Sequence, residues 1–231
     1  MGDVKPVNTE GQIRRLPRGP HRLAREEVLA SQRQRMLEAM ANAVAAKGYS
    51  ATTVADVVGG AGVSRKTFYE HFRDKEECFL FAFDAGVQLL VDTVEQATLE
   101  AQGRWSEHIR AGVRAYLSAL AAVPAFARTF LIEVLAAGPR ALERRAQVHR
   151  RFATLLKTLH ETYRAEHPGE LPKLPDEVFL ATVGAVNELV SDRVREGRTA
   201  ELLELEPVIS YLQIAFLAGH GAGEELLRGE D

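Results

Sequence analysis

A stretch rich in cations and hydroxyl groups lies at residues 62–77, GVSRKTFYEHFRDKEE. Arg65 and Lys66 carry positive charge, and Thr67 and Tyr69 carry hydroxyl groups. Groups of this kind bind phosphate oxygens, and Arg and Lys also hydrogen-bond to the edges of bases. The chemistry of this stretch is therefore that of a surface that meets a nucleic acid.

The same stretch predicts a short helix with one apolar face and one polar face. On a wheel of about 100° per residue with Phe68 pointing inward, Phe72 lies on the same side and Val63 can pack beside them. A helix this short depends on such packing for its stability. The outward face carries the groups that can reach DNA, namely Arg65, Lys66, Thr67, Tyr69, Glu70 and His71.

Glu70 admits two interpretations. It stands four residues after Lys66, a spacing that favours an ion pair on the helix surface. It could instead accept a hydrogen bond from a cytosine amino group. Both interpretations keep the carboxylate on the outward face.

Two more helices are needed to position this polar face. The first is predicted to begin at Ser31, as its cap, and to end before Gly48. The second begins at Thr53 and Asp56, which have capping-box spacing, and the glycine-rich turn GGAGVS joins it to Ser64. Two short helices joined by a tight turn form a helix-turn-helix.

The segment TTVADVVGGAGVSRKTFYEHFRDKEECF resembles the DNA-binding segment of the tetracycline-repressor (TetR) family of transcriptional regulators. The run GVS..TFY.HF.DKEE carries the resemblance, which covers residues 31–85. It implies a homodimeric regulator, most often a repressor, that binds a palindromic DNA operator and is released by a small-molecule effector. By matching position, base reading falls on Arg65 and Lys66, and contacts with the DNA backbone fall on Thr53, Thr67, Tyr69, His71 and Lys75.

The second helix departs from the family's pattern. Val58 stands where a small residue is usual, and Gly59 and Gly60 stand where polar or charged residues are usual. Each interior glycine costs about 0.5–1 kcal/mol relative to alanine, so a short or frayed helix is expected. None of these changes removes a group assigned to DNA contact.

Composition predicts an all-α protein. Alanine and leucine are abundant, aromatic residues make up only 7%, and no segment has the alternation of a strand. Residues 1–75 contain 13 Lys/Arg and 8 Asp/Glu, a balance of +5, whereas the remaining 156 residues contain 16 and 24, a balance of −8. The N-terminal part therefore suits a polyanionic partner, and the rest does not.

Three regions are expected. Residues 1–30 form a basic, disordered arm rich in Gly, Pro and Arg, which either enters a DNA minor groove or is a solubilising tail. Residues 31–75 form the three-helix DNA-binding domain. Residues 76–231 form a helical domain that binds the effector and dimerises, with helices expected at 76–97, 105–122, 124–136, 140–166, 176–195 and 206–218.

The last two of these helices are the most apolar, and they either fill the core of the monomer or form a four-helix dimer interface. A ligand pocket is expected between the helices that span residues 76–195. Its candidate lining residues are polar or aromatic groups on apolar stripes, although each could instead belong to the core or the dimer interface: Tyr116, Phe126, Phe130, Glu133 and Asn187.

Other classes of protein find less support. The sequence has neither a GxSxG nor an HExxH pattern, and GGAG follows a helix where a phosphate-binding loop would follow a strand, so we expect no enzyme, metal or cofactor. An architectural DNA-binding protein without an effector is the alternative, which the acidic C-terminal region disfavours. The lone Cys78 excludes an internal disulfide, and charges interrupt the most apolar region, Leu117–Gly138, so a cytoplasmic protein is expected.

Overall fold

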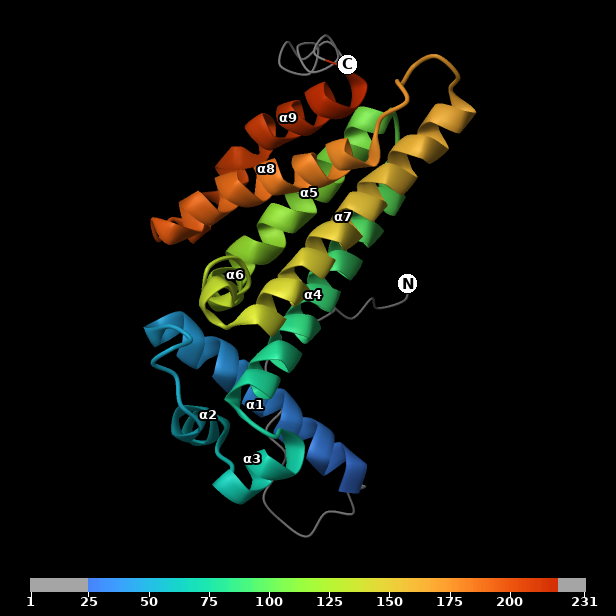
Figure 1. Cartoon of the computed structure of the whole chain (residues 1–231). Coiled ribbons are helices and arrows are strands. Elements are labelled where there is room, and N and C mark those ends of the chain that lie inside the picture. The colour runs from blue at the N-terminus through green and yellow to red at the C-terminus, as the bar shows by residue number, and fades with distance from the viewer. Residues whose placement is uncertain (1–24, 220–231) are drawn as a thin grey trace, which may run out of the picture.

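The computed structural model describes residues 25–219, and this part of the chain is helical with no strand, as the composition predicted. The N-terminal helices form one end of the molecule, and long helices run from there to the other end (Figure 1). In chain order the elements are α1 (Arg25–Lys47), α2 (Val54–Ala61), α3 (Arg65–His71), α4 (Lys75–Glu100), α5 (Trp105–Ala122), α6 (Pro124–Leu131), the 3-10 helix η1 (Glu133–Ala136), α7 (Pro139–Glu166), α8 (Asp176–Arg195), the 3-10 helix η2 (Thr199–Leu205) and α9 (Glu206–Ala218).

The first helix begins earlier than the sequence predicted. α1 starts at Arg25, so Ser31 lies inside the helix and residues 25–30 do not belong to an arm. Glu26 and Glu27 lie in its first turn, where negative charge interacts favourably with the helix dipole. The rest of the predicted arm, residues 1–24, lies outside the described residues.

The predicted caps that frame the helix-turn-helix are confirmed. Thr53 and Asp56 form a complete capping box, in which the Asp56 carboxylate accepts the Thr53 backbone N–H at 2.7 Å. Gly62 ends α2 in the left-handed region, at φ +62°. The Ser64 hydroxyl then caps α3 by accepting the Thr67 N–H at 3.0 Å.

The two interior glycines of α2 do not interrupt it. The helix is short, as predicted, but it continues through Gly59 and Gly60. A Cβ atom on Gly60 would lie 3.1 Å from Cβ of Ala39, so this glycine lets α2 approach α1 closely. Val58 is half-buried against the core.

α4 connects the N-terminal end to the rest of the molecule. Asp74 caps it by accepting the Glu77 N–H at 2.8 Å. An apolar stripe is buried along its length, at Phe79, Leu80, Phe83, Val87, Leu90, Val91 and Val94. Cys78 is fully buried among them, and burial raises the pKa of its thiol to about 12, so it is a packing residue.

The predicted helix 124–136 is two elements, because α6 ends at Leu131 and η1 follows. This segment packs against the N-terminal helices. The Glu133 carboxylate accepts the Tyr49 N–H at 2.9 Å, and the Thr129 hydroxyl donates to the carbonyl of Ala41 at 3.4 Å. α6 and η1 therefore join the long helices to α1 and to the loop after it.

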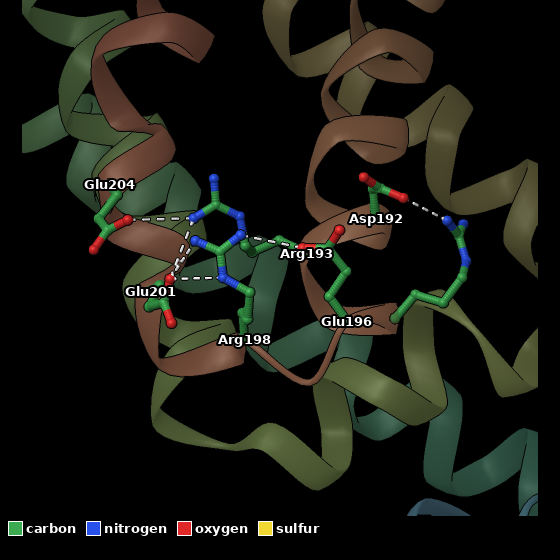
Figure 2. Close-up of polar contacts among 7 residues, drawn as sticks. Asp192, Arg193, Glu196, Arg198, Glu201 and Glu204 are labelled. Carbon is green, nitrogen blue, oxygen red and sulfur yellow. Dashed lines mark hydrogen bonds and ion pairs between the residues drawn. The ribbon is translucent and has the colours of Figure 1, made fainter.

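α8 and α9 lie side by side along one edge of the bundle (Figure 1). Charged side chains hold the turn between α8 and η2 (Figure 2). Arg193 pairs with Glu204 at 3.3 Å and with Glu201, and Arg198 pairs with Glu201 and with Glu196 at 3.1 Å. Single surface pairs contribute about 0–1 kcal/mol, but pairs that share partners restrict one another. This network fixes the direction in which the chain enters α9.

The close contact of α4 with α6 depends on Gly86. A Cβ atom there would lie 2.1 Å from the ring of Phe126. We therefore expect Gly86→Ala to lower the free energy of unfolding by about 1–3 kcal/mol through overpacking, measured by urea denaturation followed by circular dichroism. The matched control is Gly59→Ala, which meets nothing within 4 Å and should stabilise by about 0.4–1 kcal/mol. Equal stability of the two variants would contradict this packing.

Candidate nucleic-acid interface and inner cavity

α3 turns one face to the core and one to solvent, as the helical wheel predicted. Phe68 and Phe72 are 0% and 1% exposed, and their ring centroids are 5.5 Å apart. Tyr69 is 55% exposed, and Arg65 and Lys66 are exposed beside it. The outer side of α3 thus carries two cations and a phenol on a backbone fixed by buried aromatic rings.

Both cations at the start of α3 are available to a partner. Within residues 25–219, Arg65 and Lys66 form no hydrogen bond and no ion pair. The expected ion pair between Lys66 and Glu70 is therefore wrong. Ordering two exposed, flexible side chains costs about as much free energy as such a pair gains.

The hydroxyl groups of the two threonines assigned to DNA contact interact with side chains at the starts of α2 and α3. The Thr53 hydroxyl donates to Asp56 at 2.6 Å, and its backbone N–H donates to the same carboxylate. The hydroxyls of Thr67 and Ser64 are 3.0 Å apart, and either can donate to the other. Thr67 can therefore still donate to a phosphate when Ser64 supplies the proton between them, whereas both donors of Thr53 are in use.

His71 and Lys75 are half-buried at the edges of the exposed surface. The Nε2 atom of His71 lies 3.4 Å from the Gln32 side-chain oxygen, and burial, with a smaller effect from Arg33, lowers the pKa of this histidine. The Nζ atom of Lys75 donates to the Tyr49 carbonyl at 2.9 Å, and burial lowers its pKa. Lys75 thus ties the first turn of α4 to the loop between α1 and α2.

The ring of Tyr49 completes this junction. The Lys75 ammonium lies 4.2 Å from the centre of the ring, a cation–π distance, and the ring packs edge-on against Phe79 at 4.9 Å. The N–H of the same residue donates to Glu133. Tyr49 therefore links Lys75 on one side to η1 on the other.

A cavity of about 80 Å³ lies between α4, α5, α7, α8 and α9, with one side chain from α6. Its walls are mainly aliphatic and aromatic, and among residues 25–219 no Asp or Glu lines it. Its polar lining residues are Thr98, His108, Tyr116, His149, Asn187 and Gln213. Small-molecule sites typically combine apolar walls with a few polar groups in this way.

Three of the five predicted pocket residues line this cavity, namely Tyr116, Phe130 and Asn187. Phe126 does not, because its ring stacks on Phe130 at 5.4 Å and covers Gly86. Glu133 does not either, since its carboxylate is directed to Tyr49 and pairs with Arg128 at 3.3 Å. Sequence position placed both residues near the cavity, but the break at the end of α6 turns Glu133 toward the N-terminal helices.

Sequence reasoning missed the polar residue with which α7 lines the cavity, His149. His149, Phe152 and Leu156 follow one another at intervals of three and four residues, so they share a helix face. His149 interrupts that apolar face, which was the available signal. Arg145 precedes it by one turn, and the charge of Arg145 contributes to the lowered pKa of His149.

In the described part of the chain, no helix is long and apolar enough to cross a membrane. No curated protein sequence matches the chain significantly. Residues 36–81 match the family model described as bacterial regulatory proteins, tetR family. This match covers the end of α1, all of α2 and α3, and the start of α4.

Solved structures of bacterial regulators share the fold along most of the chain. The fatty acid degradation regulator FadR from Bacillus halodurans has a TM-score of 0.71 at 21% identity, over 79% of this chain and 94% of its own. FadR from Bacillus subtilis, in complex with stearoyl-CoA, has a TM-score of 0.70 at 17% identity, over 80% and 98%. The regulator PfmR from Thermus thermophilus has a TM-score of 0.60 at 23% identity, over 81% and 96%.

Identities this low show a shared fold, and the N-terminal match adds a shared sequence pattern at the helix-turn-helix. Within that pattern, α3 exposes the cations Arg65 and Lys66 on a helix held by the buried rings of Phe68 and Phe72. Residues 36–81 therefore carry the sequence pattern of the tetR family of bacterial regulatory proteins at the helix-turn-helix, and the chain shares its overall fold with solved bacterial regulators.

Proposed function

We propose that the protein is a homodimeric repressor that binds a palindromic operator through α3 and leaves it when a small molecule occupies the cavity. In this proposal α1 to α3 bind DNA, and the helices from α4 onward hold the effector and the dimer partner. One observation carries the proposal: the segment α6–η1 both lines the cavity, through Phe130, and bonds to the loop after α1, through Glu133.

This segment supplies a physical route from ligand to DNA. A ligand that displaces Phe130 shifts the end of α6, and with it the carboxylate that holds the Tyr49 N–H. The carbonyl of Tyr49 holds Lys75, at the start of α4. A shift at this junction changes the spacing of two recognition helices that must enter successive major grooves. The FadR structure with stearoyl-CoA gives a relative of the same fold with a small molecule bound.

The exposed side chains of α8 and α9 support a dimer. Phe179 and Ile209 are buried within the monomer, so each helix contributes to its own core. Large apolar side chains remain exposed on both helices and on η2, namely Leu180, Leu189, Leu203, Val208 and Phe216. A second copy that packs against α8 and α9 would cover part of this apolar surface, double the recognition helix and explain a two-fold symmetric operator.

The direct test is selection of operator DNA from a random duplex pool by the purified chain, with the mass of the complex measured by light scattering. We expect a dimer bound to a palindrome whose half-sites lie about one helical turn, ~34–36 Å, or a multiple of it apart. A monomer on an asymmetric site would contradict the proposal. Selection of no sequence at all would favour an architectural protein.

Glu133 provides a test of the junction that needs no ligand. Glu133→Ala removes the acceptor of the half-buried Tyr49 N–H, so we expect the free energy of unfolding to fall by about 1–3 kcal/mol and operator affinity to fall with it. Glu133→Gln keeps an acceptor oxygen and should retain most of both. Denaturation curves and operator titrations measure the two effects. Operator affinity unchanged in Glu133→Ala would show that α6–η1 does not position the DNA-binding helices.

A further inference from the structure

Three of the polar residues in the cavity wall come from α5, α7 and α8. Tyr116 comes from α5, His149 from α7 and Asn187 from α8. The Asn187 amide donates to the Ser191 hydroxyl at 3.4 Å, and the Tyr116 ring packs edge-on against Phe152 at 5.9 Å. The other wall residues are mainly aliphatic or aromatic, with Thr98, His108 and Gln213 contributed by α4, the start of α5 and α9. We call the part of the wall formed by Tyr116, His149 and Asn187 the polar end of the cavity, and the rest its body.

An arginine without an acidic partner lies next to this polar end, on the same face of α7 and one turn beyond the residues that line the cavity. Arg145 lies one turn before His149 on α7, and its charge acts on both Tyr116 and His149. Its Nε atom is buried without a hydrogen-bond partner, and within residues 25–219 its side chain makes no ion pair. Other arginines of α7 do have acidic partners, since Arg144 pairs with Asp84 and Arg150 with Glu143.

A buried guanidinium N–H without an acceptor is unfavourable, because desolvation is not offset by a hydrogen bond. Nothing acidic among the cavity-lining residues can offset it. Burial raises the pKa of Tyr116, so its phenol keeps its proton. Burial, and secondly Arg145, lower the pKa of His149, which favours the neutral imidazole. The polar end thus offers a cation and a hydroxyl donor, a set that suits an anionic oxygen.

We propose that the effector is an apolar molecule ending in a carboxylate, with its hydrocarbon part in the cavity body and its carboxylate bound by Arg145 and Tyr116. This inference rests on the proposed ligand-controlled function and names the class of ligand. A guanidinium binds a carboxylate with two parallel charge-assisted hydrogen bonds, which a neutral amide cannot match. The carboxylate supplies the acceptor that the Nε atom of Arg145 lacks.

The test compares decanoate with decanamide, which has the same carbon skeleton and no charge, by titration calorimetry on the full chain. We expect decanoate to bind about tenfold to a hundredfold more tightly, the range for a hydrogen bond to a charged group. Arg145→Gln should remove this preference, and Tyr116→Phe should reduce it. Arg150→Gln is the matched control on the same helix, because Arg150 is exposed and pairs only with Glu143, and it should keep the preference.

The outcomes separate this inference from the function on which it rests. Equal binding of decanoate and decanamide, or an undiminished preference in Arg145→Gln, overturns the carboxylate site while leaving a ligand-controlled repressor in place. Binding of neither compound by a chain that selects a palindrome also overturns the site and leaves operator binding intact. Decanoate that binds through Arg145 without loosening the selected operator supports the site and contradicts the release mechanism. Should Arg145→Gln fail to fold, Tyr116→Phe and the two ligands on the wild-type chain decide the question.

Discussion

Phe68→Ala is expected to lower the free energy of unfolding by about 3–5 kcal/mol and to abolish operator binding. The ring is fully buried and lies against Phe72 at 5.5 Å and Tyr69 at 5.4 Å, so its removal leaves a cavity beneath the recognition helix. α3 spans seven residues, too few for a helix to persist without packing. We therefore expect the loss of packing and the loss of α3 to occur together.

Denaturation followed by circular dichroism measures the stability, and operator titration measures the binding. The matched control is Tyr69→Phe, one residue further along α3, which removes a single hydroxyl from an exposed ring. It should leave stability within about 0.5 kcal/mol of the wild type while weakening operator binding. A Phe68→Ala variant with wild-type stability would show that the aromatic rings do not hold α3.

The second large effect concerns which side chains read the operator. Arg65→Ala and Lys66→Ala should relax base preference at particular positions, with a loss of about 1–3 kcal/mol for each bidentate base contact, or roughly tenfold to a hundredfold in affinity. Their exposure and their lack of partners in the described part of the chain leave both cations available for such contacts. The measurement is affinity for a set of operators that each carry a single changed base pair.

Tyr69→Phe and Lys75→Ala are the counterparts that should weaken all operators alike, because these residues are expected at the DNA backbone. Lys75→Ala should also reduce the slope of log affinity against log salt by about one unit. The Lys75 ammonium also donates to the Tyr49 carbonyl, so Lys75→Ala removes a contact between α4 and the loop after α1. The free energy of unfolding of this variant must therefore be measured in parallel. The proposed orientation is wrong if Lys75→Ala changes base preference and the α3 cation variants do not.

Tyr49, in the loop between α1 and α2, contacts both α4 and η1. Its N–H bonds to Glu133, its carbonyl to Lys75, and its ring contacts both Lys75 and Phe79. α4 is one connection between the N-terminal helices and the cavity, which it lines with Val94 and Thr98. The segment α6–η1 is a second connection, because α6 lines the cavity with Phe130 and Glu133 of η1 bonds to Tyr49.

Features that depend on residues a few positions apart could be predicted from the sequence. The capping box of Thr53 and Asp56, the cap at Ser64 and the inward direction of Phe68 each rest on spacing within one helical turn. The limits of α5 and of α8 followed from apolar periodicity and from glycine and proline at their ends. These features can be predicted because the interacting residues lie within one helical turn, so their spacing in the sequence fixes their distance in space.

Tertiary structure alone decided the contacts between distant residues. Glu133 and Tyr49 lie 84 residues apart in the chain, and no local pattern indicates that η1 turns this carboxylate to the loop after α1. The unpaired state of Arg145 likewise depends on which acids the neighbouring helices bring near, since Arg144 beside it in sequence finds Asp84 on α4. Periodicity shows which face of a helix is buried, but the neighbours of that face are fixed only when the helices pack.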